Sequence, residues 1–152
     1  MSTVHVGAPL AGRVVPLTDV PDPVFADEIV GPGVAIDPPP GTVTVVSPVA
    51  GRLVKLHPHA FVVLTADGAG VLVHLGIDTV QLDGEGFDLH ATEGGDVEAG
   101  QAIVSWNPAA VTAGGRSAIC PVVALDTAGD AVRDRRVAVE VAAGDVLFTV
   151  DR

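Results

Sequence analysis

Short valine-rich runs separated by glycine and proline are the feature that most restricts how this chain can fold. The 152 residues include 18 Gly and 12 Pro, and the apolar runs between them are only a few residues long. Such a pattern is typical of many short strands joined by turns, so the sequence predicts an all-β chain. The predicted strands are residues 12–15, 34–36, 42–46, 52–56, 60–65, 71–75, 102–105, 122–125, 137–141 and 146–150.

Helical structure is predicted at one place, residues 108–113. Asn107 is a suitable N-cap, Pro108 stands at the first helical position, and Gly114 follows where the helix must end. A helix of this length has one or two turns. We therefore expect at most short helical turns in the fold.

Two segments of the sequence are each repeated. PLAGRVVPL at 9–17 returns as PVAGRLVKL at 48–56, and VEAGQAIV at 97–104 returns as VAAGDVLF at 141–148. Ala-Gly turns could recur simply because the chain is rich in Val, Ala and Gly. Two unlike units, each present twice, instead predict a pseudo-symmetric sandwich, and the chain length predicts a single domain over residues 1–152.

The chain is strongly acidic. It carries 8 Lys and Arg against 19 Asp and Glu, a formal charge of −11, and Lys55 is its single lysine. Nucleic acid and anionic membranes are poor partners for such a surface, which is either merely solvated or a docking face for a basic protein.

No segment of the sequence is suited to membrane insertion. The longest unbroken apolar run, 60–64, is far shorter than the roughly 18 residues that cross a bilayer, and residues 1–6 lack a signal-peptide pattern. We expect a cytoplasmic protein. Cys120, the single cysteine, precedes Pro121 in an apolar run and is expected in the core without chemistry.

Three of the five histidines flank one predicted hairpin. His5 and His90 lie outside it and are expected to have no chemical role. His57 and His59 precede the apolar run 60–65, and His74 lies near the end of the run 71–75. The two runs are connected by a five-residue segment that contains the hairpin dipeptide Asp-Gly.

A two-residue Asp67-Gly68 turn would place His59 opposite Gly76 and His74 opposite Phe61. The two histidines would then share one face as diagonal neighbours, roughly 7–8 Å apart at Cα. A turn centred one residue earlier would place them directly opposite each other, and only an even register would put them on opposite faces. We expect a histidine pair.

The sequence around His74 suits a nucleophile. Its neighbours Val73 and Leu75 are apolar, and burial keeps an imidazole neutral and therefore nucleophilic near pH 7. Gly76 allows a close backbone approach, and Asp78 supplies a carboxylate. These features favour acceptance of a phosphoryl group, with a purely structural histidine pair as the plain alternative.

The same residues could also bind zinc. His57 and His59 form an H-x-H motif, and His74 and Asp78 form H-x-x-x-D, which together could hold zinc with an open position for water. A zinc-dependent hydrolase or peptidase of β-hybrid architecture is therefore the alternative function. Zinc peptidases of that architecture carry the two motifs in the opposite order, which counts against it.

Four segments together carry a family resemblance: VPDPVF at 20–25, GPGVAI at 31–36, HAF at 59–61 and HLGIDTVQLDGEGF at 74–87. In these segments the chain resembles the glucose-family enzyme IIA of the bacterial phosphoenolpyruvate-dependent sugar phosphotransferase system. The resemblance extends from residue 9 to residue 150. It implies a flattened antiparallel β-sandwich, a barrel-sandwich hybrid, whose shallow face carries both histidines.

The resemblance also implies roles for the histidines. His74 matches the phosphorylated histidine, which receives a phosphoryl group from the carrier protein HPr through Nε2 and passes it to a cysteine on the IIB domain of a sugar permease. His59 matches the second active-site histidine. The backbone carbonyl of Gly76 would orient the His74 ring, whereas His57 replaces the threonine that usually orients the second ring.

Further residues are implied around the pair. Asp22 and Asp78 match acidic residues beside the site, and Phe25, with Val24 and Leu72, matches the apolar rim that receives HPr. No cofactor is required beyond a covalent phosphohistidine, with zinc bound only weakly at His59 and His74 or shared with a partner. The family also has regulatory protein partners. A likeness of residues 47–51 to biotinyl and lipoyl carrier domains fails, since Lys55 is expected within a strand rather than at a hairpin tip.

Overall fold

The computed structural model describes residues 2–152 and is built from short strands, as predicted. The strands are β1 Thr3–Gly7, β2 Gly12–Pro16, β3 Gly33–Asp37, β4 Val43–Val46, β5 Gly51–His57, β6 Ala60–Leu64, β7 Gly70–His74, β8 Asp88–Leu89, β9 Asp96–Val97, β10 Ala102–Trp106, β11 Cys120–Leu125, β12 Val132–Arg133, β13 Glu140–Val141 and β14 Val146–Asp151. Helical residues form α1 Pro23–Ala26, α2 Pro108–Ala113 and the 3-10 turns η1 Leu17–Asp19, η2 Thr79–Leu82 and η3 Gly129–Ala131.

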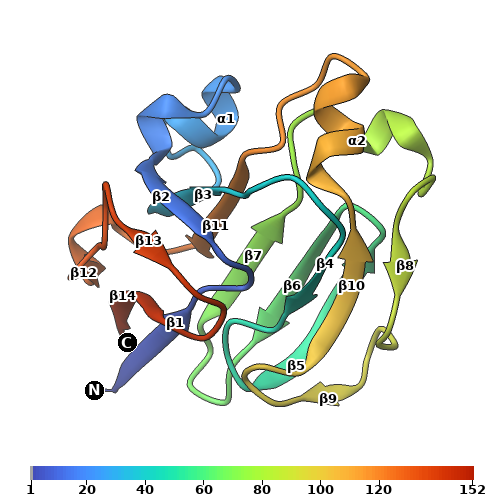
Figure 1. Cartoon of the computed structure of the whole chain (residues 1–152). Coiled ribbons are helices and arrows are strands. Elements are labelled where there is room, and N and C mark those ends of the chain that lie inside the picture. The colour runs from blue at the N-terminus through green and yellow to red at the C-terminus, as the bar shows by residue number, and fades with distance from the viewer. Residues whose placement is uncertain (1) are drawn as a thin grey trace.

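The strands form three sheets in a flattened sandwich (Figure 1). The largest sheet has eight strands in the order β13-β2-β3-β11-β7-β6-β5-β9, and the two smaller sheets are β1-β14-β12 and β4-β10-β8. Every strand pairing among residues 2–152 is antiparallel. The predicted antiparallel β-sandwich is therefore confirmed.

Hydrogen bonds confirm the predicted pseudo-symmetry. At one end of the large sheet β2 pairs with β13, and at the other end the equivalent strand β5 pairs with β9. In the two smaller sheets, the pairing of β1 with β14 corresponds to the pairing of β4 with β10. The turns before the repeated strands make matching bonds: Ala8 N to Asp145 O (2.7 Å), Ser47 N to Gln101 O (2.9 Å), Gly144 N to Ala8 O (2.9 Å) and Gly100 N to Ser47 O (2.9 Å). The repeated sequences thus occupy equivalent places in the two halves.

Two apolar clusters hold the sandwich together. The main core lies between the sheets and buries Trp106, Phe61 and Phe148, each at most 2 % exposed. Cys120 is fully buried there, and burial raises the pKa of its thiol to about 12, as expected for an inert core cysteine. A second, smaller cluster forms where η1 and α1 cover β3 and β11, and its members are Leu17, Val20, Phe25, Ala35, Ile77 and Val123.

The local predictions succeed where the signal is strong. α2 begins and ends as predicted, and the Asn107 side chain accepts a hydrogen bond from Ala109 N at 3.0 Å. The predicted strand 137–141 is wrong in most of its length, because Ala138 has a positive φ of 60° and only Glu140–Val141 remains a strand. Strands β1, β8, β9 and β12, three of them with only two residues, and the four-residue helix α1 are not predicted by the sequence pattern.

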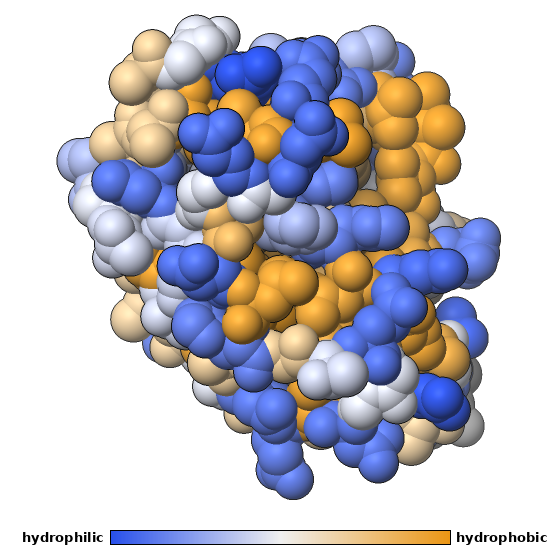
Figure 2. Space-filling view, turned by 90° about the vertical axis from the view of Figure 1, so that its right-hand side faces the viewer, coloured by the Kyte–Doolittle hydropathy of each residue, from blue (hydrophilic) through white to orange (hydrophobic). Residues whose placement is uncertain are grey.

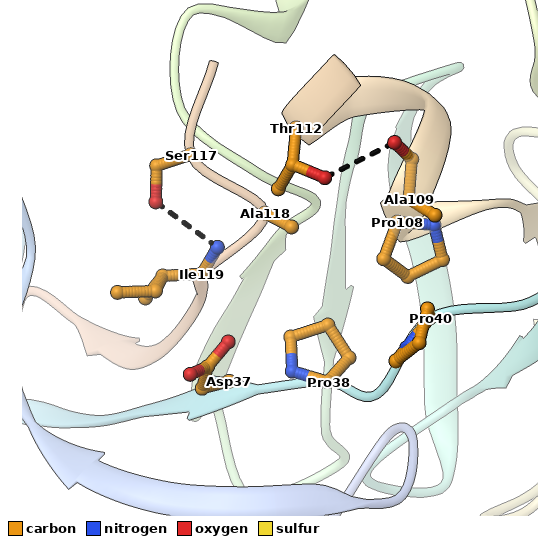
Figure 3. Close-up of a pocket in the computed structure, with 9 residues that line it drawn as sticks. All are labelled: Asp37, Pro38, Pro40, Pro108, Ala109, Thr112, Ser117, Ala118 and Ile119. Atoms are coloured by element: carbon orange, nitrogen blue, oxygen red, sulfur yellow. Dashed lines mark hydrogen bonds between the residues drawn. The ribbon is translucent and has the colours of Figure 1, made fainter. Parts of the chain in front are cut away.

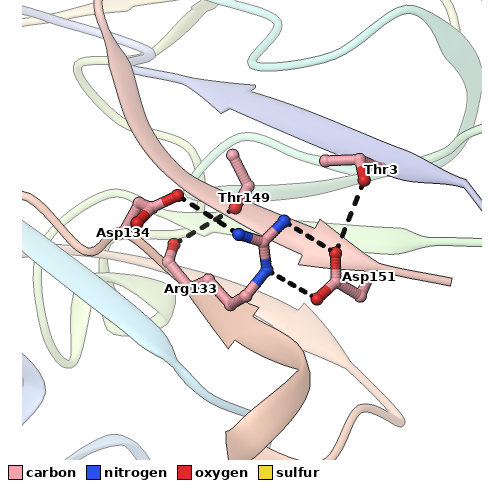
Figure 4. A network of polar contacts seen from close by, with 5 residues as sticks. All are labelled: Thr3, Arg133, Asp134, Thr149 and Asp151. Atoms are coloured by element: carbon pink, nitrogen blue, oxygen red, sulfur yellow. Dashed lines mark hydrogen bonds and ion pairs between the residues drawn. The ribbon is translucent and has the colours of Figure 1, made fainter.

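The chain ends meet in the β1-β14-β12 sheet, where Arg133 and Asp151 form a bidentate ion pair (Figure 4). The two Arg133 nitrogens lie 2.6 and 2.9 Å from the carboxylate oxygens, and Thr3 adds a bond at 3.5 Å. Both charged side chains are substantially exposed, so water screens the pair and it contributes little to stability.

The surface on the β8 and β9 side mixes apolar patches with hydrophilic side chains (Figure 2). Leu64 and Leu89 are among the exposed large apolar residues, at 41 % and 46 %. Within residues 2–152 no helix has the length and apolar character needed to cross a membrane.

Candidate active site

His74 is the last residue of β7 and points away from the main core. In this part of the sheet Phe61 and Val73 face the core and are buried, whereas Leu72 and His74 lie on the other face and are half-buried. Alternation along the strand explains this placement, since residues two apart share a face.

The predicted register of the hairpin is wrong, although the predicted histidine pair is present. Ala60 lies opposite His74 and Leu64 opposite Gly70, because the connection is a five-residue loop over 65–69 rather than a two-residue turn. In this register Phe61 faces the core, so His59, two residues earlier, would also face the core if β6 extended to it. β6 instead begins at Ala60, so His59 lies in the turn after β5, where alternation does not apply.

The turn nevertheless brings the two rings together. The His59 carbonyl accepts a hydrogen bond from Leu75 N at 2.8 Å, which ties the turn to the end of β7. The ring centroids of His59 and His74 lie 5.3 Å apart in an edge-to-face arrangement of 73°. The proximity of the histidines therefore depends on the turn and not on strand pairing.

The Gly76 carbonyl orients the His74 ring. Nδ1 of His74 lies 2.5 Å from Gly76 O, and a carbonyl can only accept, so Nδ1 carries the proton in the neutral ring. The remaining nitrogen, Nε2, then has the free lone pair. Gly76 has φ +77°, and a Cβ added there would lie 2.8 Å from Thr79 Cγ2 and 2.9 Å from Ser117 O, so this turn requires glycine.

Phe25 forms an apolar wall against His74. The two ring centroids are 5.2 Å apart, and Phe25 is 6 % exposed. α1 brings it there: Asp22 caps the helix by accepting a hydrogen bond from Val24 N at 3.0 Å, and the second apolar cluster holds the helix on the sheet. Of the expected rim residues, Val24 is 43 % exposed and Leu72 is half-buried, so the surface offered to a partner comes more from Val24 than from Phe25.

Burial keeps both histidines neutral near pH 7. Desolvation lowers the pKa of His74, opposed by the hydrogen bond to Gly76 and by the negative charges of Asp22 and Asp78. Desolvation also lowers the pKa of His59, and the neighbouring His74 and His57 lower it further. A neutral His74 retains the Nε2 lone pair that a nucleophile requires.

A pH titration should show this neutrality directly. We expect the ring protons of His59 and His74 to titrate by NMR with midpoints below 6.5, the ordinary pKa of a histidine. The unfolded chain binds these protons more readily, so the two groups contribute stability that is present above pH 6.5 and is lost as the pH falls through their folded-state pKa values. Midpoints at or above 6.5 would contradict the burial argument.

His57 stacks on His59 instead of bonding to it. The ring centroids are 5.8 Å apart at an angle of 25°, and within residues 2–152 no hydrogen bond involves the His57 ring. Because the two rings are stacked, the exposed His57 ring covers one side of His59 and shields it from solvent. At this position, where the family resemblance implies an orienting threonine, His57 makes a stacking contact with His59.

The zinc set proposed from the sequence does not assemble. Across residues 2–152, no three or more His, Cys, Asp or Glu side chains are arranged to hold a metal ion. His57, His59, His74 and Asp78 thus do not form the predicted ligand cluster. Asp78 is exposed, with a positive φ of 62°, and its charge acts on His74 from the rim.

The histidine site is a shallow surface rather than a cavity. A groove of about 500 Å³ lies between α2 and the residues after β3, lined mainly by apolar side chains with Asp37 at one side (Figure 3). A smaller cavity of about 260 Å³ lies beside Phe87 and Trp106. Neither is lined by a histidine; His59 and His74 are instead half-buried at the surface.

Several residues of the site were missed in the sequence. In the loop after β7, the Thr79 hydroxyl donates a hydrogen bond to Leu75 O, and Ser117 O accepts one from Ile77 N. Two large apolar residues are exposed: Ile29, which follows α1, at 70 %, and Val80, which follows Thr79, at 59 %. Thr79 and Val80 lie within the quoted HLGIDTV segment, so a signal was present for them. Ser117 is far away in the sequence, and nothing local indicates its contact with Ile77.

Comparisons with known proteins agree with this geometry. The family model of the phosphoenolpyruvate-dependent sugar phosphotransferase system, EIIA 1, matches residues 4–129. The PTS system glucose-specific EIIA component of Halalkalibacterium halodurans is 42 % identical over 140 residues, which cover 91 % of this chain and 80 % of the relative. That of Bacillus cereus is 42 % identical over 138 residues, which cover 90 % of this chain and 81 % of the relative.

A solved structure extends the match to three dimensions. Glucose permease IIA from Mycoplasma capricolum superposes with a TM-score of 0.90 at 33 % identity, covering 99 % of this chain and 97 % of that one. The resemblance inferred from the sequence is thereby confirmed over nearly the whole fold. This chain therefore belongs to the EIIA 1 family of the phosphoenolpyruvate-dependent sugar phosphotransferase system.

Proposed function

We propose that this protein is a phosphocarrier, in which His74 accepts a phosphoryl group from phospho-HPr and passes it to a cysteine on the IIB domain of a sugar permease. One observation carries the proposal. The short contact between Nδ1 of His74 and the Gly76 carbonyl leaves Nε2 as the nitrogen with a free lone pair, in a ring that burial keeps neutral.

The transfer itself balances without a cofactor. The Nε2 lone pair forms a bond to phosphorus while the bond between phosphorus and its donor atom on HPr breaks. Nδ1 keeps its proton, and the positive charge that develops on the ring is stabilised by the Gly76 carbonyl, Asp22 and Asp78. In the onward step a thiolate of IIB attacks the same phosphorus, and the electrons of the N–P bond return to Nε2.

His59 is suited to stabilising the group in transit. Phosphoryl transfer passes through a loose transition state with charge on three equatorial oxygens, so a donor placed beside the phosphorus lowers the barrier. A neutral imidazole has one N–H, and the His59 ring lies 5.3 Å from that of His74. The buried Phe25 wall limits the access of water.

The surface around the site suits a basic partner with an apolar contact face. Asp22 and Asp78 supply negative charge, and Val24, next to the Phe25 that packs on His74, supplies exposed apolar surface. Complementary charge steers encounter and favours fast exchange of partners, which a carrier between two proteins requires. Because the named relatives are glucose-specific components, the IIB domain of a glucose permease is the first acceptor to test.

Incubation with phosphoenolpyruvate, enzyme I and HPr should add one phosphate to the protein. Intact-mass spectrometry should show a single phosphoryl group that is labile in acid and stable in base, since a phosphoramidate and not an ester is formed. Labelling from preformed phospho-HPr should be unchanged in excess chelator. A base-labile or acid-stable phosphate would contradict the proposal, as would stoichiometric zinc in the purified protein together with a chelator-sensitive peptidase activity.

A further inference from the structure

We propose that Thr79 is a positioning residue, which sets the tautomer of His74 by holding the Gly76 carbonyl in place. The inference deepens the proposed function, on which its kinetic consequence rests. Thr79 is the first residue of η2 and is only 1 % exposed, although its side chain carries a hydroxyl. That hydroxyl donates a hydrogen bond to Leu75 O at 2.8 Å.

The bond closes the loop that presents the Gly76 carbonyl. Leu75 O belongs to the peptide that immediately precedes Gly76, so the hydroxyl restrains this peptide from one side. The peptide on the other side of Gly76 is restrained by the bond from Ile77 N to Ser117 O at 2.9 Å. With both flanking peptides held, the Gly76 carbonyl has little freedom to turn away from Nδ1 of His74.

The Thr79 methyl group acts on the same turn. A Cβ added to Gly76 would lie 2.8 Å from Thr79 Cγ2, so the methyl occupies the space beside the glycine. Thr79 therefore restrains the turn in two ways: its hydroxyl bonds to the backbone, and its methyl packs against the left-handed residue. The two contributions can be separated by substitution, since serine keeps only the hydroxyl and valine keeps the apolar branch.

The carbonyl matters because it selects which ring nitrogen is protonated. The two nitrogens of a neutral histidine exchange one proton, and the hydrogen bond made by one nitrogen decides where it resides. A carbonyl held against Nδ1 keeps the proton there and leaves Nε2 unprotonated. If the carbonyl moves, the tautomer with the proton on Nε2 gains population, and that tautomer has no lone pair with which to attack phosphorus.

The test compares Thr79→Val with Thr79→Ser and with Thr149→Val. Thr149 is a matched control, because it is also buried, at 5 % exposure, and donates to a carbonyl, Arg133 O, in the sheet of the chain ends. The readouts are the ¹⁵N shifts of Nδ1 and Nε2 in His74, which report the tautomer, and the kcat and KM for acceptance from phospho-HPr. If Thr79→Val does not fold, Thr79→Ala, which also lacks the hydroxyl, takes its place.

Thr79→Val should shift the His74 tautomer toward Nε2–H and lower kcat about fivefold, the effect expected for one intramolecular hydrogen bond, with KM unchanged. Thr79→Ser keeps the hydroxyl and should retain most of the wild-type tautomer and kcat, falling short only by the contribution of the methyl, and Thr149→Val should change neither. A wild-type tautomer and kcat in Thr79→Val, or a Thr79→Ser variant as impaired as Thr79→Val, would overturn the proposal. The NMR measurement needs no partner protein, so it tests Thr79 even if the wild-type chain accepts no phosphate.

Discussion

Replacing His74 by glutamine should abolish phosphorylation of the protein. Glutamine has a similar size and can still hydrogen-bond the Gly76 carbonyl, but its amide nitrogen has no lone pair available for attack on phosphorus. We therefore expect no phosphate on the variant after incubation with phosphoenolpyruvate, enzyme I and HPr, under conditions that label the wild-type chain completely. Intact-mass spectrometry measures the outcome directly.

His90→Gln is the matched control for this experiment. His90 is exposed, and its Nε2 bonds to the Ser105 hydroxyl at 2.7 Å on the β4-β10-β8 sheet, outside the histidine pair. This variant should be labelled as the wild type is. Undiminished labelling of His74→Gln would show that another residue accepts the phosphoryl group and would refute the assignment.

The second large effect is expected for His59→Gln, in the onward step. This variant retains the His74 nucleophile and should still become phosphorylated, although more slowly. Transfer to the IIB domain should fall by about 10²–10³-fold, the usual cost of losing a donor placed against transition-state charge, because the more flexible glutamine side chain does not hold its amide N–H at the position of the imidazole N–H. Single-turnover transfer from the isolated phosphoprotein to IIB measures this step without interference from HPr.

His57→Gln separates the donor role of His59 from the stacking that supports it. Because His57 only stacks on His59, its replacement should reduce onward transfer far less than His59→Gln does. His90→Gln again serves as the unaffected control. Equal onward rates in His59→Gln and the wild-type chain would show that His59 is merely structural. An equal loss of onward transfer in His57→Gln and His59→Gln would show that the orientation of the His59 ring, and not its hydrogen-bond donation, controls the rate.

The shallow site is consistent with transfer between proteins. An enclosed cavity would exclude solvent by itself, whereas here the histidines lie on a surface that a partner must cover. Phe25 packs against the nucleophile from one side, and strand β7 holds His74 at its end. The sandwich therefore contributes by placing two rings at a fixed separation while leaving them accessible.

The local structure of this protein is largely determined by its sequence alone. Most strands of four or more residues, the boundaries of α2 and the two repeated units follow from short-range patterns, because turn residues, caps and apolar alternation act within a few residues. The VPDPVF, GPGVAI, HAF and HLGIDTV segments likewise indicated the family and the histidine pair. Short elements such as α1 and β12 escaped, since two to four residues contain too little periodicity to be detected.

The tertiary structure alone decided how the site is assembled. The sequence pattern predicts that His59 and His74 pair across two strands, but a five-residue loop changes the register, and the turn before β6 brings the rings together instead. Phe25 reaches His74 because α1 packs on a sheet formed by distant segments, and Ser117 reaches Ile77 across 40 residues of chain. Such contacts depend on loop lengths and on packing between remote residues, and no local pattern in a single sequence records them.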